Sequence, residues 1–317
     1  MSGSDCRGVD GALRAGVQLP NYGTGASEIG AMAAVAESAG FDSVWLSDHV
    51  VLVADAASRY PFSSDGKFFL APSEDWFEWA VTAGYLACAT HEVEIGVGVA
   101  VLPLRHPLLL AKQVATLDRL SGGRIVLGVG AGWLTEEMRA LGVEPAGRGV
   151  AMDEGLRLLR AAWAGNPASG RYGRYELPEG VWCRPVPVRD PLPVFVGGGS
   201  RAVARRVARW AQGWFGSGLG GAPTVDDVVA MRQMIAQECV AIGRDPAEVE
   251  TALRVSVRAR EIGSGRLAEQ VRAYAEAGVT RISFDLSWAR DPRTMEGRLV
   301  ELRAAVASAD RRTEVGD

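Results

Sequence analysis

Hydrophobic positions along the chain follow two different spacings. Short, nearly continuous apolar runs at 14–20 (RAGVQLP), 43–47 (SVWLS) and 93–102 (VEIGVGVAVL) are typical of strands that are buried on both faces. Between the first two runs, apolar residues such as Ile29 and Met32 recur at intervals of three and four, which indicates one face of a helix. The chain therefore begins with alternating strands and helices.

The same alternation continues to the C-terminal end. Further strands are expected at 124–130, 193–198, 213–216, 250–259 and 281–287, and further helices at 75–90, 106–120, 150–163, 200–211, 224–243, 265–278 and 291–309. The segment 166–193, rich in Pro and Gly, is expected to be a loop without regular elements. Eight strand–helix pairs in a single domain, 1–317, predict an α/β fold, a closed (β/α)8 TIM barrel with insertions in the strand–helix loops. A doubly wound open sheet is the alternative fold.

Two segments fall outside this repeat. Residues 53–74 follow the second strand and so begin at the mouth of the predicted barrel. Connections longer than about 12–15 residues at such a place often close over an active site, so we predict a lid there. Residues 310–317 are expected to form a disordered tail.

Composition and charge exclude several classes of function. The formal net charge is −4 and Lys and Arg are scattered, which argues against a nucleic-acid partner. No apolar run approaches the roughly 18 residues that a membrane span needs, and the N-terminal stretch has no signal-peptide core, so we expect a cytoplasmic protein. The four cysteines are widely spaced and form no ligand pattern with the three histidines, so no metal site is expected.

Asp48 and His49 end the second predicted strand. In a TIM barrel the chemistry lies at the C-terminal ends of the strands. An imidazole there is able to give or take a proton near neutral pH, and an acid stands beside it. We therefore predict that His49 and Asp48 are catalytic. The alternative is that His49 hydrogen-bonds the main chain and fixes the strand end.

Glycines gather at the same strand ends. The candidate cofactor-binding positions are Gly98 and Val99, Gly130 and Gly132, Gly197, Gly198, Gly199 and Ser200, and Gly216, Ser217 and Gly218. Such glycines either permit tight turns or let main-chain N–H groups approach a flat ring or a phosphate. Three of them precede Ser200, a good N-cap, so we predict a phosphate site where that helix begins. The run GVGAGW at 128–133 has Trp133 in place of the last glycine of a dinucleotide-binding motif and follows the fourth strand, which argues against that motif.

Three larger side chains near these strand ends keep two interpretations each. Trp76 and Trp133 either line a substrate pocket or pack in the core. Arg105 either caps the helix that follows it or contacts the bound molecules.

Six fragments together resemble one known family. They are VQLPNYG, GFDSVWLSDHV, IGVGVAVLPLRHP, LSGGRIVLGVGAGWLTEE, VFVGGGSRAVARR and GWFGSG, in this order. Their order and spacing are similar to those of the bacterial luciferase-like monooxygenases, in the branch that often uses the 8-hydroxy-5-deazaflavin coenzyme F-420. The resemblance implies a TIM barrel with a flavin or deazaflavin at its C-terminal mouth. The ring would lie against the second and third strands, and the phosphate near the fifth and sixth.

The resemblance also implies roles for single residues. Asp48 would lie beside the ring and His49 would move a proton to or from the substrate. Gly98–Val99 matches a position at which relatives hold a non-prolyl cis peptide bond. The phosphate contacts would come from the main chain of Gly198, Gly199 and Gly218 and from Ser217.

The function implied is oxidoreduction, with reduced coenzyme F-420 passing a hydride to or from a small organic substrate. The first alternative is a monooxygenase that uses reduced FMN and O2, with the flavin supplied by a separate reductase. The second is a non-catalytic flavin-binding relative, against which the intact Asp48–His49 pair argues. Family members are commonly homodimers. Relatives that oxidise sugar phosphates carry a glutamate where this chain has Ala131, which argues against that reaction.

Overall fold

The structure is a computed structural model, which describes residues 13–218, 222–286 and 289–310. Its barrel strands are β1 (Arg14–Gln18), β2 (Ser43–Leu46), β3 (Glu94–Val101), β4 (Ile125–Gly130), β7 (Val194–Gly197), β8 (Gly213–Gly216), β9 (Glu250–Ser256) and β10 (Arg281–Asp285). Each strand pairs in parallel with its neighbours, and β10 pairs with β1 to close the barrel. The predicted TIM barrel is confirmed, and the open sheet is excluded.

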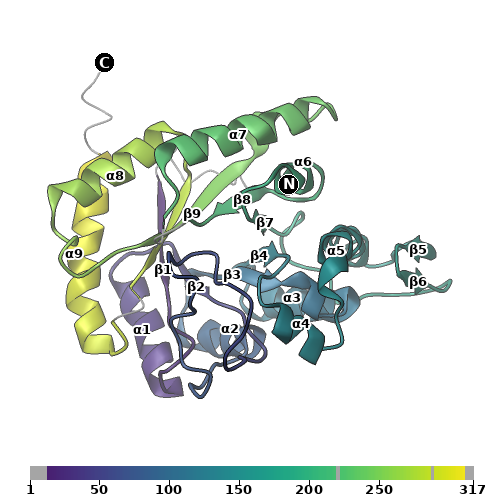
Figure 1. Cartoon of the computed structure of the whole chain (residues 1–317), viewed down its shortest axis with the longest axis horizontal. Coiled ribbons are helices and arrows are strands. Elements are labelled where there is room, and N and C mark those ends of the chain that lie inside the picture. The colour runs from purple at the N-terminus through teal and green to yellow at the C-terminus, as the bar shows by residue number, and fades with distance from the viewer. Residues whose placement is uncertain (1–12, 219–221, 287–288, 311–317) are drawn as a thin grey trace.

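A ring of helices covers the outside of the barrel (Figure 1). These are α1 (Ala26–Ser38), α2 (Trp79–Ala89), α3 (Pro107–Leu120), α5 (Arg148–Trp163), α6 (Arg201–Trp210), α7 (Val225–Val240), α8 (Gly265–Glu276) and α9 (Pro292–Asp310). Strands such as β2 and β4 are buried along their whole length because helices cover one face and side chains fill the other. No helix in the described parts of the chain is long and apolar enough to cross a membrane.

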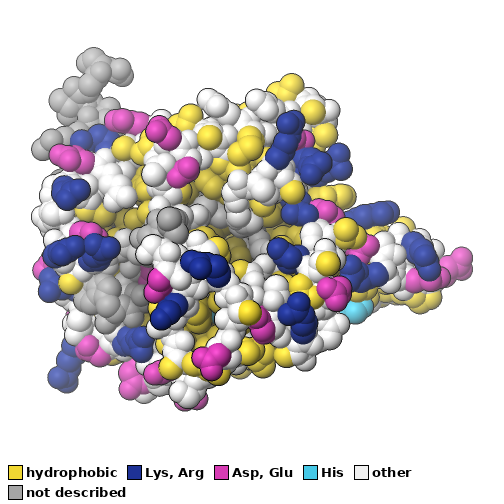
Figure 2. All heavy atoms as spheres, viewed as in Figure 1, with side chains coloured by type: hydrophobic (Ala, Val, Ile, Leu, Met, Phe, Trp, Pro, Cys, Tyr) yellow, Lys and Arg dark blue, Asp and Glu magenta, His cyan; other side chains and the backbone are white. Residues whose placement is uncertain are grey.

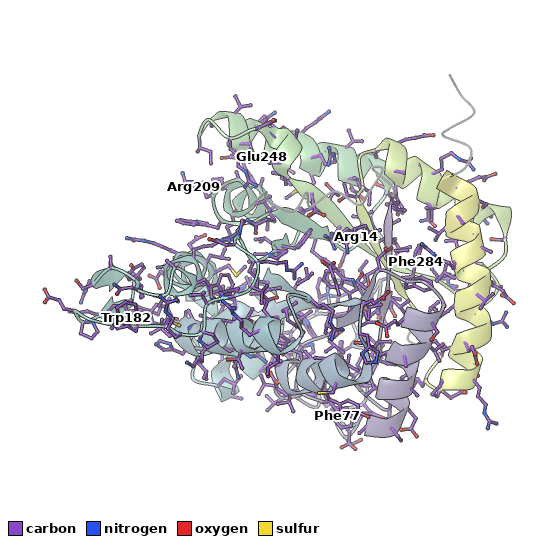
Figure 3. The ribbon with its side chains drawn as sticks, turned by 180° about the vertical axis from the view of Figure 1, so that it is seen from behind. Arg14, Phe77, Trp182, Arg209, Glu248 and Phe284 are labelled. Carbon is purple, nitrogen blue, oxygen red and sulfur yellow. The ribbon has the colours of Figure 1, made fainter. Side chains whose placement is uncertain are left out.

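Some elements differ from the predictions. A hairpin of β5 (Gly170–Tyr172) and β6 (Tyr175–Leu177) lies in the segment predicted to be loop, because Tyr172 and Leu177 pack on Leu158 of α5. Figures 1 and 3 show this hairpin as an arm that projects from the barrel, near the labelled Trp182 in Figure 3. The short helix α4 (Thr135–Ala140) was also not predicted. Helix α2 begins at Trp79 and not at 75, since Trp76 forms a β-bridge with Tyr22.

Single helical turns lie at Leu102–Leu104, Pro145–Gly147 and Pro246–Glu248. At the C-terminal end of the chain, the expected tail begins at Asp310, the last residue of α9, and 311–317 lie outside the described residues.

Charged side chains close the N-terminal end of the barrel. Glu94 accepts a hydrogen bond of 2.5 Å from Arg281 and forms ion pairs with Arg14 at 3.0 Å and Arg189 at 2.9 Å. Figure 3 shows Arg14 near the middle of the ring of helices. Burial opposes ionisation of Glu94, but the three guanidinium groups hold its pKa below the ordinary value.

An apolar layer lies above these charges inside the barrel. It consists of Trp45, Val126, Phe195, Phe215 and Ala252, with Val99 packed against it. Because charges and this layer fill the lower barrel, the open space is left at the C-terminal end of the strands.

We predict that Glu94→Gln lowers the free energy of unfolding at pH 7 by about 3 kcal/mol, because it removes the buried carboxylate that Arg14, Arg189 and Arg281 share. The loss is at the lower end for a buried ion pair, since Arg281 keeps its pair with Glu250. Urea unfolding followed by circular dichroism measures this. The folded-state pKa of Glu94 is depressed, so the difference from wild type should be full at pH 7 and shrink as the pH falls below the ordinary value of 4.5. The control is Glu301→Gln in an exposed pair with Arg298, with an expected effect below about 1 kcal/mol. Equal effects of the two changes would contradict the prediction.

Candidate active site

A cavity of about 370 Å³ opens at the C-terminal ends of the strands. Of the residues predicted from the sequence, its wall contains Asp48, His49, Trp76, Gly98, Val99, Gly130, Gly132, Trp133, Gly197, Gly198, Gly199, Ser200 and Ser217. Arg105 and Gly216 lie outside this wall, and Gly218 lines a neighbouring cavity. Figure 2 shows hydrophobic side chains in recesses near the middle of one face, with Lys and Arg side chains around them.

His49 is held by a buried carboxylate from another part of the chain. Its Nδ1 lies 2.9 Å from Oε2 of Glu137, which belongs to α4. The other oxygen of Glu137 accepts hydrogen bonds from the main-chain N–H groups of Val50 and Val51. Both side chains are buried, with 8% of the His49 side chain and 3% of the Glu137 side chain exposed. Hydrogen bonds at the imidazole therefore join the residues that follow β2 to the helix that follows β4.

This contact decides which ring nitrogen carries the proton. An ionised carboxylate only accepts hydrogen bonds, so Nδ1 of His49 must be the donor. In the neutral imidazole Nε2 then has no proton and is a hydrogen-bond acceptor. Since His49 lines the cavity, its ring is able to take a proton from a bound molecule and return it.

Aromatic rings surround His49. The rings of Trp76, Phe68 and Trp133 stand edge-on to the imidazole, with centroids 4.9, 5.3 and 5.8 Å away. Tyr60 packs in turn on Trp133 and Phe68. Trp76 and Trp133 therefore lie in the cavity wall, and their contact with a substrate stays a prediction. Apart from Glu137, the described surroundings of the imidazole are mainly apolar, which strengthens electrostatic interactions at this point.

Both oxygens of the Asp48 carboxylate accept hydrogen bonds from neighbouring residues at the cavity wall. Arg105 donates to both of its oxygens, at 2.6 and 2.7 Å, and the N–H of Val101 donates to one of them at 2.8 Å. Burial raises the pKa of the Asp48 carboxyl and the guanidinium opposes that change. The cap of α3 is His106, whose side chain accepts from the N–H of Leu108. Arg105 thus neither caps that helix nor reaches the cavity, but joins Asp48 to Glu78.

Val99 forms the floor of the cavity. The peptide bond between Gly98 and Val99 is cis, as the family resemblance implies. A Cβ added at Gly130 or Gly197 would lie 2.6 or 3.0 Å from the Val99 side chain, so these glycines make room for valine. Gly199 differs, because a Cβ there would meet nothing within 4 Å. Outside the wall, Gly216 is needed for packing, since a Cβ would lie 2.7 Å from Leu253.

One end of the cavity is suited to an anion. Helix α6 begins there with Ser200 as its N-cap, and the first N–H groups of a helix have no partner within it. Gly198 has a φ of 114°, a conformation that favours glycine and turns the chain into the helix. Arg148 and Arg206 line the same cavity, and Asp153 holds Arg206 in place. The two arginines were not predicted, because many arginines in the sequence lie on helix surfaces.

The segment after β2 is fastened at its base to α4. Glu136 accepts from the N–H groups of Ala57 and Ser58, and Ser58 also pairs with Thr135. Hydrogen bonding by the Ser58 side chain, helped by the main-chain N–H groups of Ser58 and Ala57, lowers the pKa of Glu136 to about 2. Beyond Ser58 the segment carries aromatic side chains to the cavity, among them Tyr60 and Phe68. Figure 1 shows it in dark blue near the middle of the ring of helices.

Glu137 was also missed by sequence reasoning. The run TEE at 135–137 reads as the acidic first turn of a helix, a common feature that complements the helix dipole. A usable signal is that Glu136 and Glu137 come soon after the end of β4, and so lie at the same end of the barrel as His49.

Comparisons with known proteins show what the chain is similar to. The sequence model of the luciferase-like monooxygenase family matches residues 12–313. An uncharacterized protein of Mycobacterium tuberculosis is 30% identical over 264 residues, which cover 81% of this chain and 86% of the relative. An F420-dependent glucose-6-phosphate dehydrogenase of Nakamurella multipartita is 32% identical over 219 residues, which cover 67% of this chain and 58% of that enzyme.

Solved structures share the fold. An F420-dependent secondary alcohol dehydrogenase, in complex with an F420-acetone adduct, has a TM-score of 0.74 and 17% identity, covering 93% of this chain and 99% of that one. The oxygenating constituent of 3,6-diketocamphane monooxygenase from Pseudomonas putida, in complex with FMN, has a TM-score of 0.67 and 17% identity, covering 94% and 98%.

We predict that Glu137→Gln reverses the tautomer of His49. The glutamine oxygen can still accept from Val50 and Val51, but its NH2 group then faces Nδ1, which must become an acceptor while Nε2 takes the proton. Nitrogen-15 NMR of the histidine side chains at a pH where they are neutral measures this. His49→Asn identifies the signal among the three histidines. The control is Glu136→Gln, because Glu136 does not contact the imidazole. The prediction is refuted if His49 has the same tautomer in Glu137→Gln as in wild type.

Proposed function

The chain belongs to the luciferase-like monooxygenase family, and on that premise we propose that it uses coenzyme F-420 for hydride transfer. The reduced coenzyme would give the hydride to a small organic substrate, or the oxidised coenzyme would take it from one. The observation that carries this proposal is the buried His49–Glu137 pair at the cavity wall, a proton acceptor in the place where substrate would lie. Support for the cofactor comes from the relatives of about 30% identity that are named as F420-dependent enzymes.

The residues present fit such a cofactor. The N-terminus of α6, with Gly199 facing open space and Arg148 and Arg206 nearby, would hold the phosphate. Val99 would support the ring from below, because it forms the floor between the glycine-lined strand ends. The bound cofactor supplies the hydride chemistry, and the protein supplies binding, orientation and a route for the proton.

We assign the transfer of the substrate proton to His49. When a substrate alcohol is oxidised, Nε2 accepts the hydroxyl proton, and when a carbonyl is reduced, it returns the proton to the oxygen. Glu137 keeps the other nitrogen protonated and stabilises the imidazolium that forms. Asp48 has its oxygens engaged by Arg105 and Val101, so its part is to position the ends of β2 and β3. We thus propose a positioning part for Asp48, where the sequence predicts a catalytic one beside the ring.

Residues 53–74 are proposed as the lid. Their base is fixed by Glu136, and the part beyond Ser58 places Tyr60 and Phe68 against the cavity. Closure of these rings over bound substrate would exclude water from the site.

A monooxygenase that uses reduced FMN and O2 is the second candidate. The observation in its favour is the FMN complex among the proteins that share the fold, and the α6 phosphate site would hold FMN equally well. Oxidation of glucose 6-phosphate is not proposed, since Ala131 stands where the family resemblance expects the glutamate of those dehydrogenases.

Titration of the purified protein with reduced F-420 and, separately, with reduced FMN tests the cofactor. We expect F-420 to bind more tightly by at least tenfold, which is about 1.4 kcal/mol. Tighter binding of FMN by tenfold would replace the first candidate by the second.

Two substitutions check the phosphate site in the same assay. Gly199→Asp should weaken the binding of either cofactor at least about tenfold, because it adds a negative charge to the anion end without a steric clash. Gly142→Asp, in a turn outside the cavity wall, is the control for charge. It also has a positive φ of 72°, so its folding is checked by circular dichroism.

His49→Asn tests the proton route. Asparagine hydrogen-bonds but does not exchange a proton near neutral pH, so the variant should fold, bind cofactor nearly normally and lose on the order of 10²–10⁴ in turnover. Steady-state kinetics with cofactor saturation measured in parallel separates the two effects. A variant that turns over within about threefold of wild type would rule out the acid–base role.

A further inference from the structure

A second chamber of about 290 Å³ adjoins the main cavity. Tyr60, Phe62, Phe69, Ser217 and Arg254 line both spaces, so the two are neighbours across these side chains. The chamber has polar residues that the proposed reaction does not use. Of the residues predicted to contact the cofactor phosphate, Ser217 and Gly218 line it, whereas those at the start of α6 do not.

Arg254 presents part of its guanidinium group to this chamber. It extends from β9 and its Nε and Nη2 both donate to Oδ2 of Asp285, at 3.0 and 2.6 Å. Within the described residues Nη1 forms no hydrogen bond, while the side chain remains 18% exposed. A guanidinium group has five N–H donors in a planar fork, so those on Nη1 remain to be used by a ligand.

Lys67 brings a second positive charge from the segment 53–74. Its side chain lines the chamber and is exposed, and among the described residues its nearest known countercharge is the exposed carboxylate of Asp65. The chamber thus has two cations against the one carboxylate of Asp285, with Ser256 as a further polar group. Phe62 and Phe69, which are 37% and 52% exposed, supply apolar surface at its wall.

We propose that this chamber is a substrate subsite for an oxyanion, a carboxylate or a phosphate that the substrate carries away from its reacting carbon. The proposal rests on the proposed function and adds the class of substrate. Arg254 provides the directional donors and Asp285 keeps the guanidinium oriented. Lys67 completes the subsite from the lid, so an anionic substrate draws residues 53–74 toward the barrel.

Calorimetric titration of the cofactor-free protein tests the subsite. The probes are butyrate and inorganic phosphate, with 1-butanol as the uncharged match of butyrate. The chamber variants are Lys67→Met, at an exposed side chain, and the double change Arg254→Gln with Asp285→Asn, which keeps two groups able to hydrogen-bond. The controls are Arg59→Met, on the same segment but outside the chamber wall, and Arg148→Met, at the α6 anion site. Circular dichroism checks that each variant folds.

We expect at least one anion to bind more tightly than 1-butanol and to lose roughly tenfold in affinity in both chamber variants, with less than about twofold change in Arg59→Met. The anion that responds identifies the group, carboxylate or phosphate. If neither anion responds to Lys67→Met, or if Arg148→Met alone removes all anion binding, the proposal is overturned. Because no cofactor is present, these outcomes do not depend on whether F-420 is the redox partner.

Discussion

Glu137 is a carboxylate with almost no access to water, and a charge in that position is tolerated only when other groups compensate it. Its compensation comes from one short stretch, the imidazole of His49 and the N–H groups of Val50 and Val51. The stretch cannot move away from α4 without leaving the carboxylate uncompensated. The orientation of the imidazole, its tautomer and the exit of the chain from β2 therefore follow from one interaction.

The two halves of the barrel mouth differ chemically, because their strands carry different residues. On β4 and β7, glycines give room to Val99 and leave a smooth floor with a helix N-terminus at one end. On β9 and β10, Arg254 and Asp285 project from the strand ends and no glycine makes space. A flat cofactor suits the first half and a polar substrate the second. His49 enters from β2, so it can reach a reacting group held between them.

The sequence alone predicts the barrel well, because the hydrophobic spacings of strand and helix alternate eight times along the chain. The local preferences of these segments agree with the same fold. It also predicts His49 and the anion end at Ser200, because strand ends and N-caps leave local signals. It does not predict Glu137 or Arg254. Their importance comes from partners 88 and 31 residues away along the chain, and no local pattern encodes those distances. The β5–β6 hairpin was missed for the same reason, since its packing on Leu158 decides its conformation.

The two adjacent glutamates of α4 divide the segment after β2 into a fixed and a variable part. Residues 49–51 are bound by Glu137 and 57–58 by Glu136, so the segment is fixed to α4 at two points up to Ser58. Beyond Ser58 the chain is free of these bonds until Trp76 pairs with Tyr22. The tip of the segment can therefore change in sequence while the His49–Glu137 contact is kept. The same boundary marks where segments from related enzymes can be grafted onto this barrel.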